Sequence, residues 1–314
     1  MKRPWAKLFA LLLVPAMFAV ACGDDDTTTE DPIPPADDAD MDESDEDVDD
    51  PVEEVDDGLL ARVVSLSPTA TEILFAIGAG DQVVAVDQFS NYPENLPPAD
   101  LDGFAPDAEA IAAYEPQVVV MQSNDASSAI EALGITVVVQ DSPADFEGIY
   151  TQILELGDAT GNDEGAEELI AEMRVEIDAL IADAPDASGR TYYHELGTDF
   201  YSLNSDSFVA QIYALFGLVS IGDNAGGDAF AGYLPLTEEF ILTEDPDFIF
   251  LADTIWASQT SDTVAARPGW SELSAVQSGA VVELDDDVAS RWGPRVVAFA
   301  EAIADVLKVV AVPA

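Results

Sequence analysis

Residues suited to chemistry are scarce in this 314-residue chain, which contains one histidine, His194, and one cysteine, Cys22. A zinc site needs a cluster of such ligands, and a serine hydrolase needs a nucleophile beside a base and an orienting acid. The sequence has no G-x-S-x-G elbow and no glycine-rich phosphate loop. Paired carboxylates are too common among its 63 acidic residues to indicate a glycosidase. We therefore expect neither enzymatic catalysis nor a catalytic cofactor.

A second chemical pattern is a glutamate that occurs twice in the same setting. Glu109 lies seven residues before Pro116, and Glu239 lies seven residues before Pro246. In each copy an apolar run follows the proline, which predicts a short helix that starts near the glutamate, stops at the proline and leads into a buried strand. A carboxylate at such a position stabilises the helix through its dipole. Because the pattern occurs in both halves of the chain, a role at an interface is an equally good interpretation.

The elements that must position these residues are short apolar runs rich in β-branched residues, separated by amphipathic segments. Continuous apolar runs indicate strands that helices cover on both faces, as in a parallel α/β sheet. A helix should open at Ser67 and Pro68 and end near Gly78. The predicted strands cover residues 62–66, 83–86, 117–121 and 135–139 in the first half, and 190–194, 247–251 and 280–284 in the second.

Residues 164–182 separate the two sets of strands and carry apolar residues at helical spacing, with Pro185 after them. At 1.5 Å per residue this helix would extend roughly 28 Å, enough to cross between two small lobes. The sequence therefore predicts an α/β protein with an N-terminal lobe at 58–163, a connecting helix at 164–185 and a C-terminal lobe at 186–314.

The first 21 residues have the pattern of a secretion signal. Lys2, Arg3 and Lys7 precede an apolar run too short to span a bilayer, which ends in small residues before Cys22. This segment resembles a bacterial lipobox, although Ala19 stands where leucine is usual. We expect cleavage before Cys22 and lipidation of its thiol, with release as a free secreted protein as the alternative. The protein would then be extracytoplasmic and held at the cell membrane.

Residues 22–57 form an acidic segment made almost wholly of Asp, Glu, Thr and Pro. Its charges repel one another and it has too little apolar surface to offset the entropy of ordering, so we expect an extended spacer. The acidity continues beyond it, and the whole chain has a formal net charge of −53. Nucleic acid is excluded as a partner because phosphate binding requires basic patches.

Four segments together resemble one known family, the cobalamin and iron-chelate binding proteins of ABC importers, also called helical-backbone metal receptors. They are residues 62–72, 89–93, 109–116 and 291–295, and the similarity extends over nearly all of 61–307. The resemblance implies a class III periplasmic binding protein, with two Rossmann-like lobes joined by one long helix and a ligand held between them. It also implies that Glu109 and Glu239 dock into arginine-rich pockets of an ABC permease dimer with its ATPase subunits. We expect the binding protein itself to be a monomer.

The same resemblance implies which side chains line the cleft. Aromatic planes suit a flat macrocycle or an aryl chelate, although core packing is the alternative for each of them. Arg291 would bind a polar group of the ligand or pair with one of the acids at 285–287. The implied ligand-binding residues are Phe89, Ser90, Tyr92, Phe104, His194, Trp256, Arg291 and Trp292.

His194 ends a predicted strand of the second lobe, at an edge that should border the cleft. Its imidazole could coordinate a chelated metal at an open axial position, but a neutral imidazole that forms hydrogen bonds is the favoured interpretation. We expect no other residue of the chain to coordinate a metal directly. The weakly basic, aromatic cleft favours cobalamin or a related corrinoid as the ligand. A ferric siderophore or heme is the alternative within the family, with His194, Tyr92 or Tyr193 as possible heme ligands. A ligand-sensing surface module without transport is the alternative from another class.

Overall fold

The computed structural model describes residues 61–98, 100–122 and 126–310. The chain divides into two units, Met1–Val55 and Asp56–Ala314, and all described residues belong to the second. The predicted signal peptide, Cys22 and the acidic segment lie outside the described residues.

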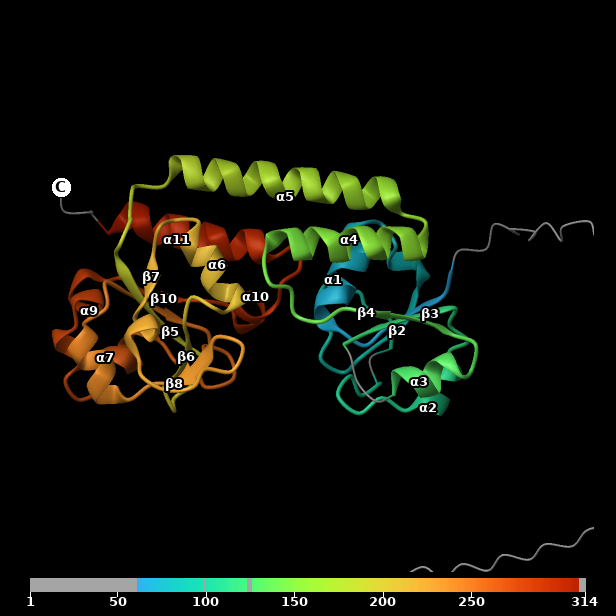
Figure 1. The fold of residues 1–314 in the computed structure, drawn as a ribbon, viewed down its shortest axis with the longest axis horizontal. Helices are drawn as coiled ribbons and strands as arrows, with labels where there is room; N and C mark the ends of the chain where they lie inside the picture. Colours follow the sequence, from blue (N-terminus) through green and yellow to red (C-terminus); the bar gives the residue numbers. More distant parts are fainter. Residues whose placement is uncertain (1–60, 99, 123–125, 311–314) are drawn as a thin grey trace, which may run out of the picture. The chain divides into compact units, whose positions relative to one another are not determined.

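The first half of the described chain forms a four-stranded parallel sheet in the order β2-β1-β3-β4 (Figure 1). All four strands coincide with predicted apolar runs, and β1 and β3 are buried throughout because helices cover both faces. Ser67 caps α1 by accepting a hydrogen bond from the Ala70 amide, and Pro68 occupies the first turn, as predicted. The elements are β1 (Val63–Ser65), α1 (Pro68–Ala76), β2 (Val83–Val86), α2 (Ala108–Ala112), β3 (Val118–Met121), α3 (Ser127–Glu131), β4 (Thr136–Val139) and α4 (Phe146–Thr160).

The second half forms another four-stranded parallel sheet, in the order β10-β9-β5-β7, and a two-stranded antiparallel sheet of β6 and β8. The predicted strands correspond to β5, β9 and β10, whereas β6, β7 and β8 have only two or three residues each and gave no apolar run. The strands are β5 (Thr191–Glu195), β6 (Tyr201–Leu203), β7 (Val219–Ser220), β8 (Tyr233–Pro235), β9 (Phe248–Leu251) and β10 (Val281–Glu283). The helices are α6 (Phe208–Ala214), α7 (Glu238–Glu244), α8 (Ser261–Ala265), α9 (Ser274–Ser278), α10 (Asp286–Ser290) and α11 (Val296–Val309).

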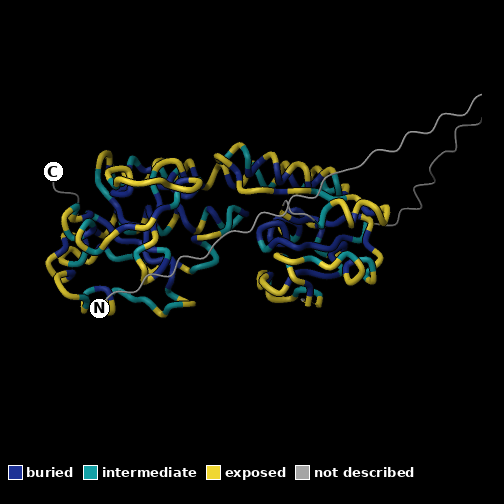
Figure 2. The backbone as a smooth tube through the Cα atoms, turned by 60° about the horizontal axis from the view of Figure 1, so that its bottom comes forward, coloured by how far each residue is buried: buried dark blue, intermediate teal, exposed yellow. Residues whose placement is uncertain are grey.

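A long helix, α5 (Asp163–Asp183), links the two halves and packs against both α4 and α11. It approaches the first half so closely at Gly165 that a Cβ there would lie 2.2 Å from the carbonyl oxygen of Ile77. Its buried residues are Ala166, Met173 and Ile177, and its other residues are exposed or intermediate, as expected for a helix with one face on the protein (Figure 2). The α/β class, with two parallel sheets and a long connecting helix, is confirmed.

The repeated glutamate pattern folds the same way in both lobes. Helices α2 and α7 are each followed by a residue in the left-handed region, Glu115 at φ 51° and Asp245 at φ 45°, directly before the proline. The residue after each proline then fixes the first strand of its lobe. Gln117 Oε1 accepts a hydrogen bond from the Arg62 amide, and Asp247 Oδ2 accepts one from the Thr191 amide. The predicted helix, stop and strand are confirmed in both copies.

Candidate functional site

A hollow of about 640 Å³ lies at the carboxyl ends of β1, β2 and β3, where the loops leave the first sheet. Ligands of open α/β sheets bind at this edge. Residues of α10 and of the segment directly after it, from the second lobe, close it on the other side. We call this hollow the main cleft. Its lining is Leu66, Ser67, Pro68, Thr69, Asp87, Gln88, Phe89, Asn91, Gly103, Phe104, Gln122, Asp287, Ser290, Arg291 and Trp292.

The base of the main cleft is a hydrogen-bonded cluster around Asp87. Its Oδ1 accepts from the Ser90 amide at 2.8 Å and from the Ser90 hydroxyl at 2.7 Å, and Ser90 Oγ lies 2.9 Å from Thr71 Oγ1. Burial raises the pKa of the Asp87 carboxyl, and the hydrogen bonds from Ser90 partly offset this. Ser90 is itself buried and therefore supports the cleft from beneath instead of lining it.

Two of the predicted aromatic residues meet at the mouth of the main cleft. The rings of Phe89 and Phe104 pack edge to face with centroids 5.1 Å apart, and Phe104 remains 79% exposed. The loop that carries Phe104 approaches Asp87 so closely at Gly103 that a Cβ there would lie 2.5 Å from Asp87 Oδ2. Exposed rings fixed in this way offer apolar area for a ligand at little entropic cost.

The other predicted aromatic residues have different positions. Trp292 lines the main cleft, whereas Tyr92 packs against the Arg295 guanidinium, 4.6 Å from ring centroid to Cζ, outside the cleft lining. Trp256 is 65% exposed on the loop after β9 and does not line the main cleft. Asp286 holds this loop by accepting hydrogen bonds from the Ile255 and Trp256 amides.

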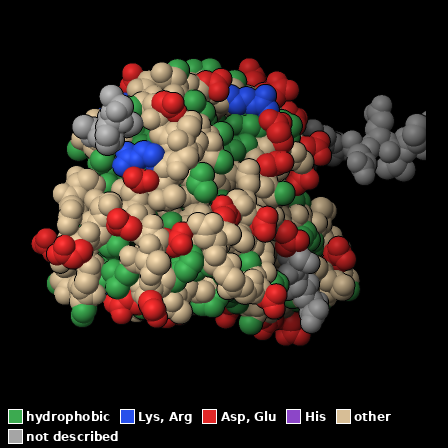
Figure 3. Space-filling view, turned by 60° about the vertical axis from the view of Figure 1, so that its left-hand side comes forward, with side chains coloured by type: hydrophobic (Ala, Val, Ile, Leu, Met, Phe, Trp, Pro, Cys, Tyr) green, Lys and Arg blue, Asp and Glu red, His purple; other side chains and the backbone are tan. Residues whose placement is uncertain are grey.

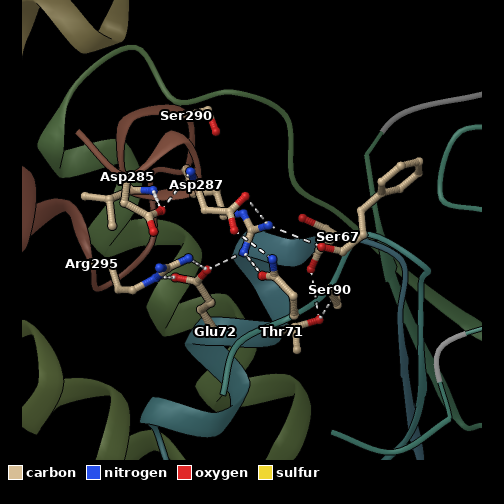
Figure 4. Close-up of polar contacts among 12 residues, drawn as sticks. Ser67, Thr71, Glu72, Ser90, Asp285, Asp287, Ser290 and Arg295 are labelled. Carbon is tan, nitrogen blue, oxygen red and sulfur yellow. Dashed lines mark hydrogen bonds and ion pairs between the residues drawn. The ribbon is translucent and has the colours of Figure 1, made fainter. Parts of the chain in front are cut away.

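Arg291 belongs to an ionic cluster that joins the two lobes, and Figure 4 labels its members Glu72, Asp287 and Arg295. Its guanidinium donates to Glu72 Oε1 at 2.9 Å and to Asp287 Oδ1 at 2.7 Å, so it pairs with acids as the sequence alternative allowed. Arg295 donates to both carboxylate oxygens of Glu72, at 2.9 and 2.6 Å. Asn91 adds a further link by donating to Asp287 Oδ2 at 2.7 Å. Glu72, from α1, is therefore bound by two arginines from the other lobe.

The expectation that His194 borders the cleft is wrong. His194 is the fourth residue of β5 and is fully buried, with its Nδ1 2.7 Å from the Tyr213 hydroxyl and its ring against Phe299. Burial lowers its pKa to about 3, so the imidazole is neutral. Glu195 follows it in β5 and pairs with Arg267 on the opposite face of the sheet. His194 is thus a core residue, since the alternation of side chains along the strand directs it toward α6 and α11.

A second, smaller hollow of about 300 Å³ shares Ser290, Arg291 and Trp292 with the main cleft. We call it the inner pocket. Sequence reasoning missed most of its lining because these side chains come from segments without a distinctive motif. Its remaining residues are Ser142, Pro143, Ala144, Asp206, Phe208, Val209, Ile212, Ala231, Tyr233, Ala289 and Phe299.

The two repeated glutamates are exposed near the N-termini of α2 and α7, and neither carboxylate has a hydrogen-bond or ion-pair partner among the described residues. Figure 3 shows that acidic side chains far outnumber basic ones on the face it presents. No group of three or more His, Cys, Asp or Glu residues suited to a metal ion occurs within residues 61–98, 100–122 and 126–310. In those same ranges, no helix combines the length and apolarity required to cross a bilayer.

Asp253, two residues after β9, is a further buried acid that sequence reasoning missed. It is fully buried, and within the described part of the chain neither carboxylate oxygen has a hydrogen-bond partner. Burial, reinforced by the charge of Glu195, raises its pKa to about 7. Burying this carboxylate in its ionised form lowers the free energy of unfolding, whereas burying the protonated form avoids that penalty.

Replacing Asp253 by asparagine should therefore stabilise the protein in a pH-dependent manner. Raising a carboxyl pKa from 3.8 to about 7 corresponds to at most about 4 kcal/mol. The wild-type protein loses stability as the pH rises from 4 to 7, because Asp253 must stay protonated in the folded state while it ionises in the unfolded state. Relative to the wild type, the free energy of unfolding of D253N should be higher by roughly 2–4 kcal/mol at pH 8 and almost equal at pH 4. Urea unfolding across this range measures the difference, with the exposed Asp158→Asn as control. An equal gain at both pH values would contradict the assignment.

Comparison with known proteins agrees with this architecture. A model of the periplasmic binding protein family matches residues 63–288. A cobalamin-binding protein of Halobacterium salinarum is 30% identical over 289 residues, which cover 85% of this chain and 76% of that protein. YvrC of Bacillus subtilis, described as an uncharacterised ABC transporter substrate-binding lipoprotein, is 28% identical over 256 residues. The match covers 78% of this chain and 79% of YvrC. The structure of the periplasmic heme-binding protein HutB of Vibrio cholerae matches with a TM-score of 0.69 at 25% identity, over 79% of this chain and 98% of that one.

Proposed function

The chain belongs to the periplasmic binding protein family, and from this premise we propose that it captures cobalamin, or a related corrinoid, for an ABC importer. At the level of the family, it is an extracytoplasmic substrate-binding protein and not an enzyme. The choice of corrinoid among the ligands of its relatives rests on the charge and shape of the main cleft.

The observation that carries this choice is that the main cleft is aromatic and has no unpaired cation. Arg291 is the one Lys or Arg among the described residues that line the main cleft and the inner pocket. Its side chain is 9% exposed and already binds Glu72 and Asp287. A polyanionic ferric chelate would leave charges without partners here, and burying an unpaired charge is costly. A corrinoid presents neutral carboxamides and a broad ring, and the ring suits the aromatic side chains of Phe89, Phe104 and Trp292.

Heme is a weaker fit to the same geometry. A heme iron requires an axial histidine or tyrosine, and its carboxylates require cations. His194 and Tyr193 are fully buried and line neither hollow, and Tyr92 packs against Arg295. Heme stays the alternative ligand because HutB, one of the solved structures that match, is a heme-binding protein.

Delivery to a permease is the second part of the proposal. Glu109 and Glu239 are exposed at equivalent places in the two lobes, which suits simultaneous docking onto a paired permease. We further propose that the protein is a monomer anchored through a lipid on Cys22. The name of the B. subtilis relative, a substrate-binding lipoprotein, supports the anchor.

Calorimetric titration of the purified protein with cyanocobalamin, hemin and a ferric hydroxamate tests the ligand. Cyanocobalamin should bind one to one with a submicromolar Kd, about −8 kcal/mol or stronger. The variant Phe89→Ala should weaken this binding about tenfold, because the ring covers the macrocycle. The exposed Phe230, which lines neither hollow, supplies the control Phe230→Ala, and this variant should bind normally. Tighter binding of hemin or of the hydroxamate would overturn the corrinoid assignment while leaving the family unchanged.

A further inference from the structure

Helix α7 begins with two adjacent glutamates, only one of which belongs to the repeated pattern. Glu239 corresponds to Glu109 of α2, whereas the residue before it is Glu238 in α7 and Ala108 in α2. Successive residues of an α-helix point about 100° apart, since the helix has about 3.6 residues per turn. The two carboxylates of α7 therefore point in different directions, and the second lobe needs a feature that decides which of them faces a partner.

The structure binds Glu238 to a buried tryptophan. Trp270 Nε1 donates to Glu238 Oε1 at 3.0 Å, and the Trp270 side chain is fully buried. Glu238 is half-buried, whereas Glu239 is exposed and its carboxylate has no partner within the described part of the chain. An indole can only donate, so this bond requires an acceptor oxygen on Glu238. The bond fixes one carboxylate against the protein and leaves the other free.

Trp270 is in turn fixed by the core of the second lobe. Arg267 lies over its ring, 4.5 Å from Cζ to the centroid, and donates to both carboxylate oxygens of Glu195 in β5 at 2.6 Å. Tyr193 packs edge to face against the indole at 6.1 Å between centroids, and Phe200 stacks on it at 5.9 Å. A bidentate arginine–carboxylate pair has a defined geometry, so the position of the indole is set by the second sheet.

The segment that contains Trp270 also holds the rest of α7. Ser274 donates its amide and its hydroxyl to the two carboxylate oxygens of Asp245, both at 2.7 Å, at the end of α7. Between these ends, Gly269 has φ of 84°, and a Cβ there would lie 3.4 Å from Leu242 Cδ1. Figure 1 shows α7 beside α9, the helix that begins at Ser274. A helix of seven residues has little stability of its own, so these contacts determine its orientation.

We propose that Trp270 is a positioning residue for permease docking. By donating its indole N–H to Glu238, it fixes the first turn of α7 so that Glu239 is the carboxylate presented to the partner. This inference rests on the proposed function, in which Glu239 docks onto the permease, and deepens it by naming the residues that act through Glu239. Without the bond, the first turn must be ordered during docking, which lowers the affinity for the permease.

The first lobe orders its docking helix in a different way, which provides an internal control. Ala108 precedes Glu109 and has no side-chain acceptor for such a bond. Helix α2 is instead capped by Asp107, whose Oδ1 accepts from the amides of Glu109 and Ala110. Substitutions at Trp270 or Glu238 should therefore act on docking through Glu239 and not through Glu109.

Two substitutions of Glu238 and one of Trp270 test the inference. Affinity for the permease dimer with its ATPase subunits, in lipid nanodiscs, is measured by surface plasmon resonance. E238A removes the acceptor without touching the core and should weaken this affinity about threefold to tenfold, the cost of immobilising a freed side chain. E238Q keeps an amide oxygen for the indole but removes the charge, and should remain within about twofold of the wild type. W270F removes the donor, keeps an aromatic ring and should match E238A.

Cyanocobalamin binding by calorimetry should stay within about twofold in all three variants, because neither Glu238 nor Trp270 lines the main cleft or the inner pocket. Circular dichroism verifies that each variant is folded. If W270F does not fold, the comparison of E238A with E238Q still decides, since Glu238 is outside the core. Equal weakening by E238A and E238Q would show that the charge of Glu238 contacts the permease directly, and would overturn the positioning role.

Combining E238A with loss of each docking glutamate tests whether it acts through Glu239. In an E239Q background E238A should weaken permease binding by less than about twofold, whereas in an E109Q background it should retain its full effect. Equal losses in the two backgrounds would overturn the inference. If E239Q alone weakens binding and E238A does not, the inference fails while the docking proposal stands. If E239Q has no effect, the docking proposal fails and this inference with it.

Discussion

Replacing Glu72 by glutamine is expected to lower the free energy of unfolding by about 3–5 kcal/mol, the usual cost of breaking a buried ion pair by removing one partner. The Glu72 side chain is 1% exposed and accepts three hydrogen bonds from Arg291 and Arg295. Without its negative charge, two guanidinium groups remain in a poorly solvated space beside one another. The arginines and Glu72 come from different lobes, so the loss should affect the whole described unit instead of one helix.

Denaturant unfolding at pH 7 measures this effect, and the chain supplies a matched control. Glu147 pairs with Arg174 at 2.9 Å, but their side chains are 75% and 52% exposed, so Glu147→Gln should cost less than about 1 kcal/mol. Salt separates the two cases further. The effect of E72Q should persist in about 1 M NaCl because buried pairs are poorly screened, whereas any effect of E147Q should vanish. A loss below about 1 kcal/mol for E72Q would show that the cluster does not hold the lobes together.

Reversing the charge of both repeated glutamates is expected to abolish ligand uptake while leaving ligand affinity within about twofold. Each exposed ion pair alone contributes little, but a reversed charge facing an arginine pocket is repulsive by several kcal/mol, and two such sites act together. Uptake by cells that express E109K/E239K with the permease should fall at least about 100-fold, since each 1.4 kcal/mol corresponds to a factor of ten. Calorimetry on the same variant should show unchanged binding, because neither residue lines the main cleft or the inner pocket.

A second double variant controls for the change in net charge. Glu167 and Glu168 are exposed on α5, and E167K/E168K alters the formal charge by the same amount as E109K/E239K. It should transport normally. Normal uptake by E109K/E239K would refute the docking role and favour a sensory module that hands its ligand to a different partner. Loss of uptake in both double variants would attribute the defect to charge alone.

The ionic cluster around Glu72 also bears on how far the lobes move. The long helix α5 packs on both halves, and the cluster adds a direct link between α1 and the segment before α11. Opening the main cleft widely would require separating Glu72 from two arginines, which is costly. The two lobes should therefore change their relative position little when a ligand binds.

The sequence by itself determined the elements that depend on local patterns. The apolar runs that became β1, β3, β5 and β9 are buried in parallel sheets, where continuous hydrophobicity is required on both faces. The α1 cap, the long helix and the two glutamate repeats were also predicted, because caps, helical periodicity and proline stops act over a few residues. Short edge strands such as β7 were missed because two residues carry no period.

The tertiary structure alone decided which side chains meet. Arg291 and Glu72 are 219 residues apart in sequence, so their contact follows from the packing of two lobes and from no local pattern. Side-chain alternation in β5 places His194 in the core, although its position at the end of the predicted strand indicated that it borders the cleft. The inner pocket arises from loops and helices of both lobes whose residues form no motif in the sequence. Asp253 is one acid among 63 in sequence, and only its burial without a partner distinguishes it. Burial, pairing and cavity shape are properties of the assembled chain, because each depends on residues that the sequence does not place side by side.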